Sequence, residues 1–275
     1  MALVIQTNVA SLQAQKNLNH AQSSLQTSFN RLSSGNRINT AKDDAAGLAI
    51  SESMKTQVRS FAVAERNAGD AVSMAQTAEG ALGEITNIVG RMRELSAQAS
   101  NGALQTSDRD FIQTEFTNLQ AETKRIMTST KFNGKTLITS ASRVDGFQVG
   151  INNTSADRIA VTFGGIDLAT VTSTATKVSG SASNARSSLD TLDTALHTVS
   201  QARARFGAAI NRLEITTSNI QTARLNISAA NSRIRDVDVA DETASLSRSQ
   251  VLTQAGTSIL SQANQSPQAA LSLIR

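Results

Sequence analysis

Large apolar residues recur every seven positions in the C-terminal third of the chain. This line consists of Leu192, Val199, Phe206, Leu213, Ile220, Ile227 and Ile234. An interleaved line completes a heptad pattern but is partly polar, with Leu189, Leu196, Arg203, Ile210, Thr217, Arg224 and Asn231. The pattern predicts one helix of roughly 45 to 50 residues, about 70 Å long at 1.5 Å per residue. We expect the first line to form the core of a helical rod.

A second long helix is predicted from about Asp44 to Ser100, since apolar residues there recur every three or four positions. They are Leu82, Ile85, Val89, Met92 and Leu95. Asp43 and Asp44 stand where the start of a helix favours negative charge. A third, shorter helix should follow Asn101-Gly102, with a capping box formed by Ser107 and Asp110. Its apolar face consists of Ile112, Phe116, Leu119 and Ile126.

The middle of the chain has a different pattern. Asn133-Gly134 predicts a tight hairpin turn, and clusters of β-forming residues at 147–151 and 158–163 predict strands, the second ending at Gly164-Gly165. The Ser/Thr/Ala-rich segment from Ala169 to Ser188 predicts a loop.

Both ends of the chain predict amphipathic helices with thin, Ala- and Gln-rich apolar stripes. The residues expected to pack are Leu18, Leu25, Leu32, Val237, Val251 and Ile259. A single helix of this kind is marginal in water, so we expect the two ends to pack against each other and against other copies of the chain.

The predicted fold is mostly α: an elongated, folded-back helical rod with coiled-coil heptads and a small β-hairpin/loop tip at mid-sequence. Residues 1–43 and 236–275 would form a domain of terminal helices, and 44–130 with 186–235 a rod domain that includes the β-hairpin/loop region 131–185. The composition agrees with this fold. Aromatic residues make up only 3% of the 275 residues, fewer than a compact globular core would normally contain. A single proline permits long helices.

Composition and motifs argue against several function classes. The net charge of +4 is scattered without a basic stripe, so nucleic acid is not an expected partner. No apolar run is long enough to span a membrane, and the N-terminus does not read as a secretory signal. The chain has no cysteine and two distant histidines, His20 and His197. We therefore expect no catalytic, metal or cofactor site and no enzymatic activity. Asn152-Asn153-Thr154-Ser155 contains glycosylation sequons, a pattern common by chance.

Two long segments resemble bacterial flagellins closely. The first is residues 31–51, RLSSGNRINTAKDDAAGLAIS, and the second is residues 259–275, ILSQANQSPQAALSLIR. The internal segments Arg91-Met92-Arg93-Glu94-Leu95 and Phe132-Asn133-Gly134 match landmarks of the same family. The resemblance covers about residues 1–135 and 186–275, so it describes a minimal flagellin without large variable outer domains.

The resemblance implies a structural subunit that polymerises into the flagellar filament for motility. It implies export in an unfolded state through the flagellar type III channel, with an export chaperone bound to the C-terminal helix. It also implies growth under a filament cap, contact with hook-associated proteins, and an extracellular location. In such proteins the terminal helices form an inner tube and the next domain forms an outer tube.

The resemblance further implies recognition by the animal Toll-like receptor for flagellin. The matching residues are Arg91, Leu95 and Glu115. Arg91 and Leu95 are four residues apart and share a helix face. One interpretation is that both are exposed and form a receptor-binding patch. The other is that Leu95 is buried in the core and that Arg91 and Glu115 are surface charges.

Two other interpretations remain open. A hook–filament junction protein shares the terminal helices, although the match from Ala41 to Ser51 and the ending at 265–269 favour flagellin. A chemoreceptor-like helical signalling hairpin has similar Ala-rich heptads, but it turns at a tight helical tip and usually carries membrane anchors.

Overall fold

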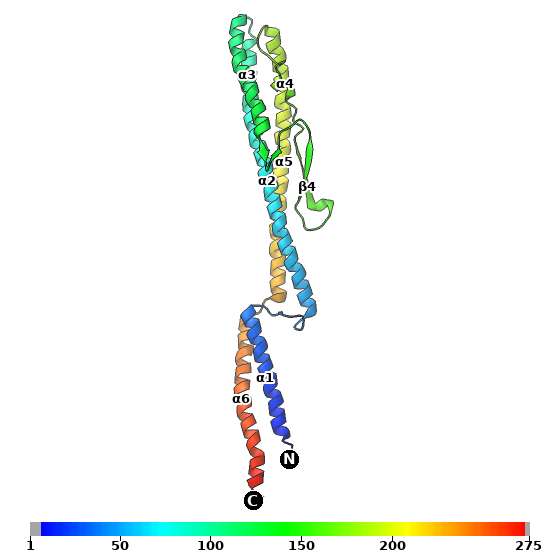
Figure 1. The fold of residues 1–275 in the computed structure, drawn as a ribbon, viewed down its shortest axis with the longest axis vertical. Coiled ribbons are helices and arrows are strands. Elements are labelled where there is room, and N and C mark those ends of the chain that lie inside the picture. The colour runs from blue at the N-terminus through cyan, green and yellow to red at the C-terminus, as the bar shows by residue number, and fades with distance from the viewer. Residues whose placement is uncertain (1–6, 273–275) are drawn as a thin grey trace. The chain divides into compact units, whose positions relative to one another are not determined.

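The structure is a computed structural model that describes residues 7–272, with side chains described up to Gln265. Long helices dominate it, and the strands form two small antiparallel pairs (Figure 1). The predicted mostly α class is confirmed. Contacts divide the chain into a terminal unit, residues up to 58 with those from 226 onward, and a central unit, residues 59–225.

The two longest helices are α2 (Ala45–Ala99) and α5 (Ala182–Arg235), and their parts within the central unit run antiparallel. Three ion pairs join them, from Arg93 to Asp193 at 2.6 Å, Glu79 to Arg203 at 2.7 Å and Glu65 to Arg224 at 2.6 Å. The α2 partners are 14 residues apart, or two heptads, so the pairs lie along one edge of the helix interface and mark its register.

The heptad of α5 is largely buried within the chain. Leu192, Val199, Phe206, Leu213 and Ile220 are buried, whereas Ile227 and Ile234, which belong to the terminal unit, are only half-buried. The interleaved line is only partly buried, with Leu196 and Ile210 packed against the core. In the first half of the helix the buried residues beside it are Ser188, Ala195 and Ala202, each one position before a residue of that line.

Small residues on α2 explain this packing. The buried line of α2 continues towards the N-terminus beyond Leu82 as Ala64, Ala68, Ala71, Ala75 and Ala78. The register of the ion pairs sets these alanines opposite Phe206, Leu213 and Ile220. Large side chains on one helix thus meet small ones on the other, which fills the interface while the backbones approach closely.

The third helix, α3 (Thr106–Ser129), packs beside the C-terminal half of α2. The side chain of Arg109, 7% exposed, donates to the carbonyl oxygens of Ala99 and Asn101 at 2.9 Å each and thereby satisfies groups at the end of α2. The predicted capping box is wrong by two residues, because the helix starts earlier: the N–H of Gln105 donates to Asp108.

The Asn-Gly hairpin is confirmed, with β1 (Lys131–Phe132) paired to β2 (Lys135–Thr136) and positive φ angles at Asn133 and Gly134. A second antiparallel pair joins β3 (Arg143–Gln148) to β4 (Arg158–Phe163), so the first of these strands ends at Gln148 rather than at 151. Gly164 ends β4 with φ 73°, and a Cβ there would lie 2.1 Å from the oxygen of Ala141.

The strands lie alongside the helices, not at the predicted tip. The rings of Phe163 and Phe206 are 5.5 Å apart, at a point well inside α5. Asn67, deep in α2, donates to the carbonyl oxygen of Gln148 at 3.0 Å. The sheet therefore covers the sides of α2 and α5 with the buried face of β4.

The predicted loop from Ala169 to Ser188 is partly wrong. It contains a one-turn helix, α4 (Ala169–Thr172), and the start of α5 at Ala182. Val171, Val178 and Ala185 are fully buried. Two glutamines of α3 hold this segment: Gln120 donates to one carbonyl oxygen of α4 and two of the coil, and Gln113 accepts from two N–H groups of the coil. These backbone contacts order a segment that lacks a periodic pattern.

Candidate self-assembly surface of the terminal helices

The terminal unit is built on two antiparallel helices, α1 (Val9–Ser34) and α6 (Val239–Ser272). Asn8 caps α1 by accepting from the N–H of Ser11 at 3.0 Å, and it donates to the carbonyl oxygen of Ala263 at 2.8 Å. At the other end of the pair, Arg31 and Glu242 lie 3.6 Å apart. Both ends of α1 are thus tied to α6 by polar contacts.

The shared face of these helices contains small residues. The buried side chains are Ser11, Ala14, Ala21 and Ser28 on α1 and Ser249 on α6. A Cβ on Gly256 would lie 3.2 Å from Cδ1 of Leu18, so glycine permits a close approach there. Because burial of Ala and Ser removes little apolar area from water, the pair gains little from its own interface.

The larger apolar residues of the pair are incompletely covered. Leu18, Leu25, Leu32 and Val237 are only half-buried. Val251 and Ile259, which were also predicted to pack, are 64% and 60% exposed in the single chain, so their packing against other copies stays a prediction. Other exposed apolar residues on the pair are Val9, Leu12, Phe29, Val239 and Leu252. This helix pair therefore presents its larger apolar side chains to the outside.

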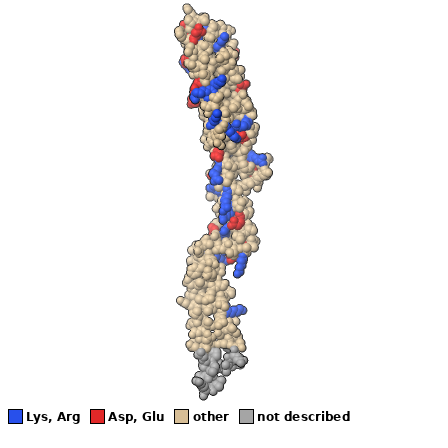
Figure 2. Space-filling model, in the orientation of Figure 1, with Lys and Arg blue, Asp and Glu red and all other residues tan. Residues whose placement is uncertain are grey.

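An open groove of about 400 Å³ runs between α1 and α6. Leu18, Ala21, Leu252, Gly256 and Ile259 contribute apolar lining to it. Charge is sparse nearby: α1 carries only Lys16 and Arg31 as full charges. Figure 2 shows few Lys, Arg, Asp or Glu residues on the face of the pair in view. A groove with apolar lining and little charge around it is a candidate protein interaction site.

The chain enters and leaves the helix pair through two short paired segments. Gly35 ends α1 in the left-handed conformation at φ 70°, as a C-terminal cap requires. The N–H of Val237 donates to the oxygen of Gly35 at 3.1 Å, and the N–H of Arg37 donates to the oxygen of Arg235 at 2.6 Å. Arg235 also pairs with Glu52 at 2.5 Å. Backbone and side-chain contacts thus hold together the segments that follow α1 and precede α6.

The two adjacent aspartates of the first signature have separate structural roles. Asp44 accepts from the N–H of Gly47 at 2.8 Å and caps α2. Asp43 accepts from the N–H groups of Asn39 and Thr40 and from the Thr40 hydroxyl. These bonds, chiefly that from the Thr40 backbone, lower the pKa of Asp43. Asp44 therefore begins the helix, as the sequence indicated, whereas Asp43 orders the loop before it.

The three candidate receptor residues lie in the central unit and are not equally accessible. Arg91 and Glu115 are exposed and pair at 2.9 Å. Hydrogen bonds from Arg91 to Glu115 and then to Glu94 raise the pKa of Arg91. Leu95 is only 2% exposed, because it belongs to the core that also contains Phe116 of α3. The expectation of an exposed Leu95 is therefore wrong.

Within residues 7–272, no helix combines the length and apolarity needed to cross a membrane. The same part of the chain contains no group of three potential metal-binding side chains. What the described residues do offer is heptad helices and a terminal pair with an apolar exterior. These features are those of a coiled-coil protein whose terminal helices expose several large apolar side chains.

Comparison with known proteins identifies the family. Residues 5–142 match the bacterial flagellin N-terminal helical region and residues 189–274 match the C-terminal helical region. A flagellin of Halalkalibacterium halodurans is 42% identical over 99% of this chain and 100% of its own length. Flagellin FlaB2 of Treponema pallidum is 37% identical over 99% and 100%. The chain belongs to the bacterial flagellin family and is a structural subunit of the flagellar filament.

These matches also bear on the alternatives. A putative flagellar hook-associated protein from Vibrio parahaemolyticus has a TM-score of 0.60 over 70% of this chain and 100% of its own, but only 13% identity, so it shares the fold alone. The junction-protein and chemoreceptor alternatives are not favoured. Only residues 143–188 separate the two matched regions, which confirms the short form of flagellin. The first six and last three residues lie outside the described part of the chain.

Proposed function

We propose that the terminal helix pair is the surface through which subunits polymerise. Residues 1–43 and 236–275 form the inner tube of the filament, and 44–130 with 186–235 form the outer tube, with 131–185 as part of that outer domain. The observation that carries this proposal is the exposure of Val251, Leu252 and Ile259 on a helix pair whose own interface is made of Ala and Ser.

Burial energetics support the proposal. Fully burying one Val, Leu or Ile contributes about 1.5 to 3 kcal/mol. Seven such large apolar side chains of the pair stand exposed, namely Val9, Leu12, Phe29, Val239, Val251, Leu252 and Ile259. Burying most of them between copies offsets the entropy lost on association, which runs from about 4 to more than 15 kcal/mol. The same residues left in water contribute nothing to the monomer.

Electron microscopy after salt-induced polymerisation tests the proposal. The full chain should form filaments, whereas the 45–235 fragment should remain a folded, soluble helical protein that does not polymerise. Leu252→Asp should prevent polymerisation because it sets a charge in the apolar contact. Asp241→Asn, a change at an exposed polar site of the same helix, is the control. Filaments from the 45–235 fragment would contradict the assigned roles.

We further propose that the chain is exported unfolded through the type III channel and reaches the extracellular filament. Its C-terminal helix binds an export chaperone, and the assembled filament contacts cap and hook-associated proteins. The exposed apolar residues of α6 support this proposal, because such a surface is prone to aggregate before assembly unless a partner protein binds it. Leu252→Asp should therefore weaken chaperone binding in a pull-down with the purified chaperone, whereas Asp241→Asn should not.

Recognition by the animal Toll-like receptor for flagellin is a second proposal. The exposed Arg91 and Glu115 on neighbouring helices support it, and Leu95 supports it only as a core residue that holds α2 against α3.

A further inference from the structure

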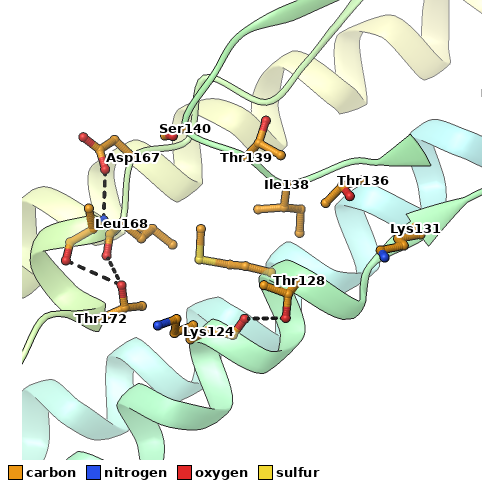
Figure 3. Close-up of a pocket in the computed structure, with 12 residues that line it drawn as sticks. Lys124, Thr128, Lys131, Thr136, Ile138, Thr139, Ser140, Asp167, Leu168 and Thr172 are labelled. Carbon is orange, nitrogen blue, oxygen red and sulfur yellow. Dashed lines mark hydrogen bonds between the residues drawn. The ribbon is translucent and has the colours of Figure 1, made fainter. Parts of the chain in front are cut away.

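A cavity in the central unit lies at the C-terminal end of α3, far from the terminal helices in sequence. Its volume is about 440 Å³, within the range of pockets that hold small ligands, roughly 300 to 1,000 Å³. Figure 3 shows Leu168 and Thr172 on one side, Lys131 and Thr136 on the other, and Ile138 between them. Met127 completes an apolar lining with Ile138 and Leu168.

The rim of this cavity is basic. Lys124 and Lys131 are exposed, and neither has an ion pair among residues 7–265. Asp167, the one carboxylate of the lining, accepts a hydrogen bond from the N–H of Ala169 at the start of α4. An apolar ligand flanked by a free carboxylate would therefore match both the lining and the rim.

Such a group is present at the opposite end of α3. Phe111 is 79% exposed, the most exposed large apolar side chain among the described residues. Asp110 precedes it, is exposed and has no ion pair in the described part of the chain. Of the other charged groups near this helix start, Asp108 accepts from the N–H of Gln105, Arg109 is buried against the end of α2, and Glu115 is paired with Arg91. Phe111 therefore combines an exposed aromatic ring with neighbouring negative charge.

We propose that Phe111 of one copy inserts into the cavity of a second copy, with Asp110 near Lys124 and Lys131. The proposal rests on the filament function and adds a contact of the central unit to it. A chain cannot fill its own cavity in this way, because Phe111 and Lys124 are 13 residues apart on one helix, about 20 Å at 1.5 Å per residue.

This contact is of the kind that a filament needs. The inserted ring and the receiving cavity are different surfaces of the same chain, so each copy can receive one neighbour and insert into another. Such a head-to-tail contact is not satisfied within a two-fold pair, and where its rotation does not close a ring it extends into an open polymer. Burial of an aromatic ring and a carboxylate–lysine pair also gives the contact a defined register.

Cysteine cross-linking tests the geometry, because the natural chain has no cysteine. The double variant Phe111→Cys/Thr128→Cys places one thiol at the ring position and one at the cavity, about 25 Å apart on α3. Polymerised and oxidised, it should give a ladder of covalent multimers. Thr117→Cys/Thr128→Cys is the matched control, since residue 117 points about 120° away from residue 111 around the helix. A ladder only in the control, or in neither variant, would overturn the contact.

Charge and ring variants test the energetics. Phe111→Ala should raise the critical concentration for polymerisation about tenfold, the loss expected for a modest interface hot spot. Asp110→Lys and Lys131→Glu should each raise it, and the double variant should restore it in part. Phe111→Ala filaments that form at the natural critical concentration would overturn the contact and leave the filament function intact. A natural chain that forms no polymer would overturn both.

Discussion

Gln120 of α3 donates a hydrogen bond from Nε2 to the carbonyl oxygen of Val171 in α4, at 2.7 Å. The same nitrogen donates to the oxygens of Ser173 and Thr176 at 3.0 Å each, and the Gln120 side chain is almost fully buried. One amide therefore holds the coil between β4 and α5 against α3. Loss of this donor would leave three carbonyl oxygens without that partner.

The first prediction follows from this contact. Gln120→Ala should lower the free energy of unfolding by about 1 to 3 kcal/mol, since buried acceptors lose their partner. Gln120→Glu should lower the free energy of unfolding further, because a carboxylate cannot donate a hydrogen bond to the carbonyl oxygens. Asn118→Ala, an exposed change on the same helix, should stay within about 0.5 kcal/mol. Urea unfolding of the monomer measures all three, and equal effects at both positions would contradict the role of Gln120.

The heptad of α5 gives the second prediction. Leu213→Ala should destabilise the central unit by about 2 to 5 kcal/mol, the range for buried large-to-small changes, and Phe206→Ala by a similar amount. Leu225→Ala is an identical substitution on the same helix at a residue 67% exposed, and it should have little effect on the monomer. Thermal melts make the comparison. Unchanged melting for Leu213→Ala would mean that this line faces solvent.

The third prediction concerns the terminal helices before assembly. Residues 1–40 and 240–275 should exchange amide hydrogens quickly in the monomer, because the α1–α6 interface buries mainly Ala and Ser. They should become protected in the filament, where copies cover the exposed apolar residues. The central helices α2 and α5, around Leu82 and Val199, serve as the internal control. Strong protection of the ends in the monomer would contradict the prediction.

The fourth prediction is a pH dependence at the α2–α5 interface. The hydrogen bond from Arg93 lowers the pKa of Asp193 below its ordinary value. A carboxyl with a lowered folded-state pKa stabilises the fold above its unfolded-state pKa, near 3.9 for Asp, and loses that effect as pH falls through the lower folded value. Asp193→Asn should therefore lower the melting temperature slightly at pH 7, and the difference should shrink below about pH 4.

The control for this pair is Asp190→Asn. Asp190 is exposed on the same helix and has no ion pair among the described residues. Its substitution should leave the melting temperature nearly unchanged at both pH values. If the difference in melting temperature between the natural chain and Asp193→Asn is as large at low pH as at pH 7, the charge of Asp193 does not cause that difference.

The fifth prediction separates receptor contact from core packing. Arg91→Asp should weaken the response of cells that carry the Toll-like receptor for flagellin and change the melting temperature little, because Arg91 is exposed. Leu95→Ala should lower stability by about 2 to 5 kcal/mol, since this residue is buried. Arg125→Asp alters another exposed, ion-paired arginine and is the control. A full response to the Arg91→Asp monomer would rule out this contact.

The sequence by itself determined the helices and the hairpin turn. The seven-residue line from Leu192 predicts α5 because a helix face repeats at nearly that period, and the Asn-Gly pair predicts the β1–β2 turn because both residues tolerate positive φ. The family signatures at both ends likewise identified the protein as a flagellin. These features depend on residues near one another in the chain, so a linear pattern is enough to predict them.

Tertiary structure alone decided which faces are buried. The sequence allows Leu95 to be a surface residue, but in the structure α3 covers that side of α2 and buries it. Ala195 is buried because the helix backbones approach so closely that only small side chains fit there. The coil after α4 is held by Gln120, which lies 53 and 56 residues away in sequence from the carbonyl groups that it contacts there. Val251 remains exposed because the helix pair packs through its Ala and Ser face. Burial depends on which elements meet in space, and the periodicity of one helix carries no information about its neighbours.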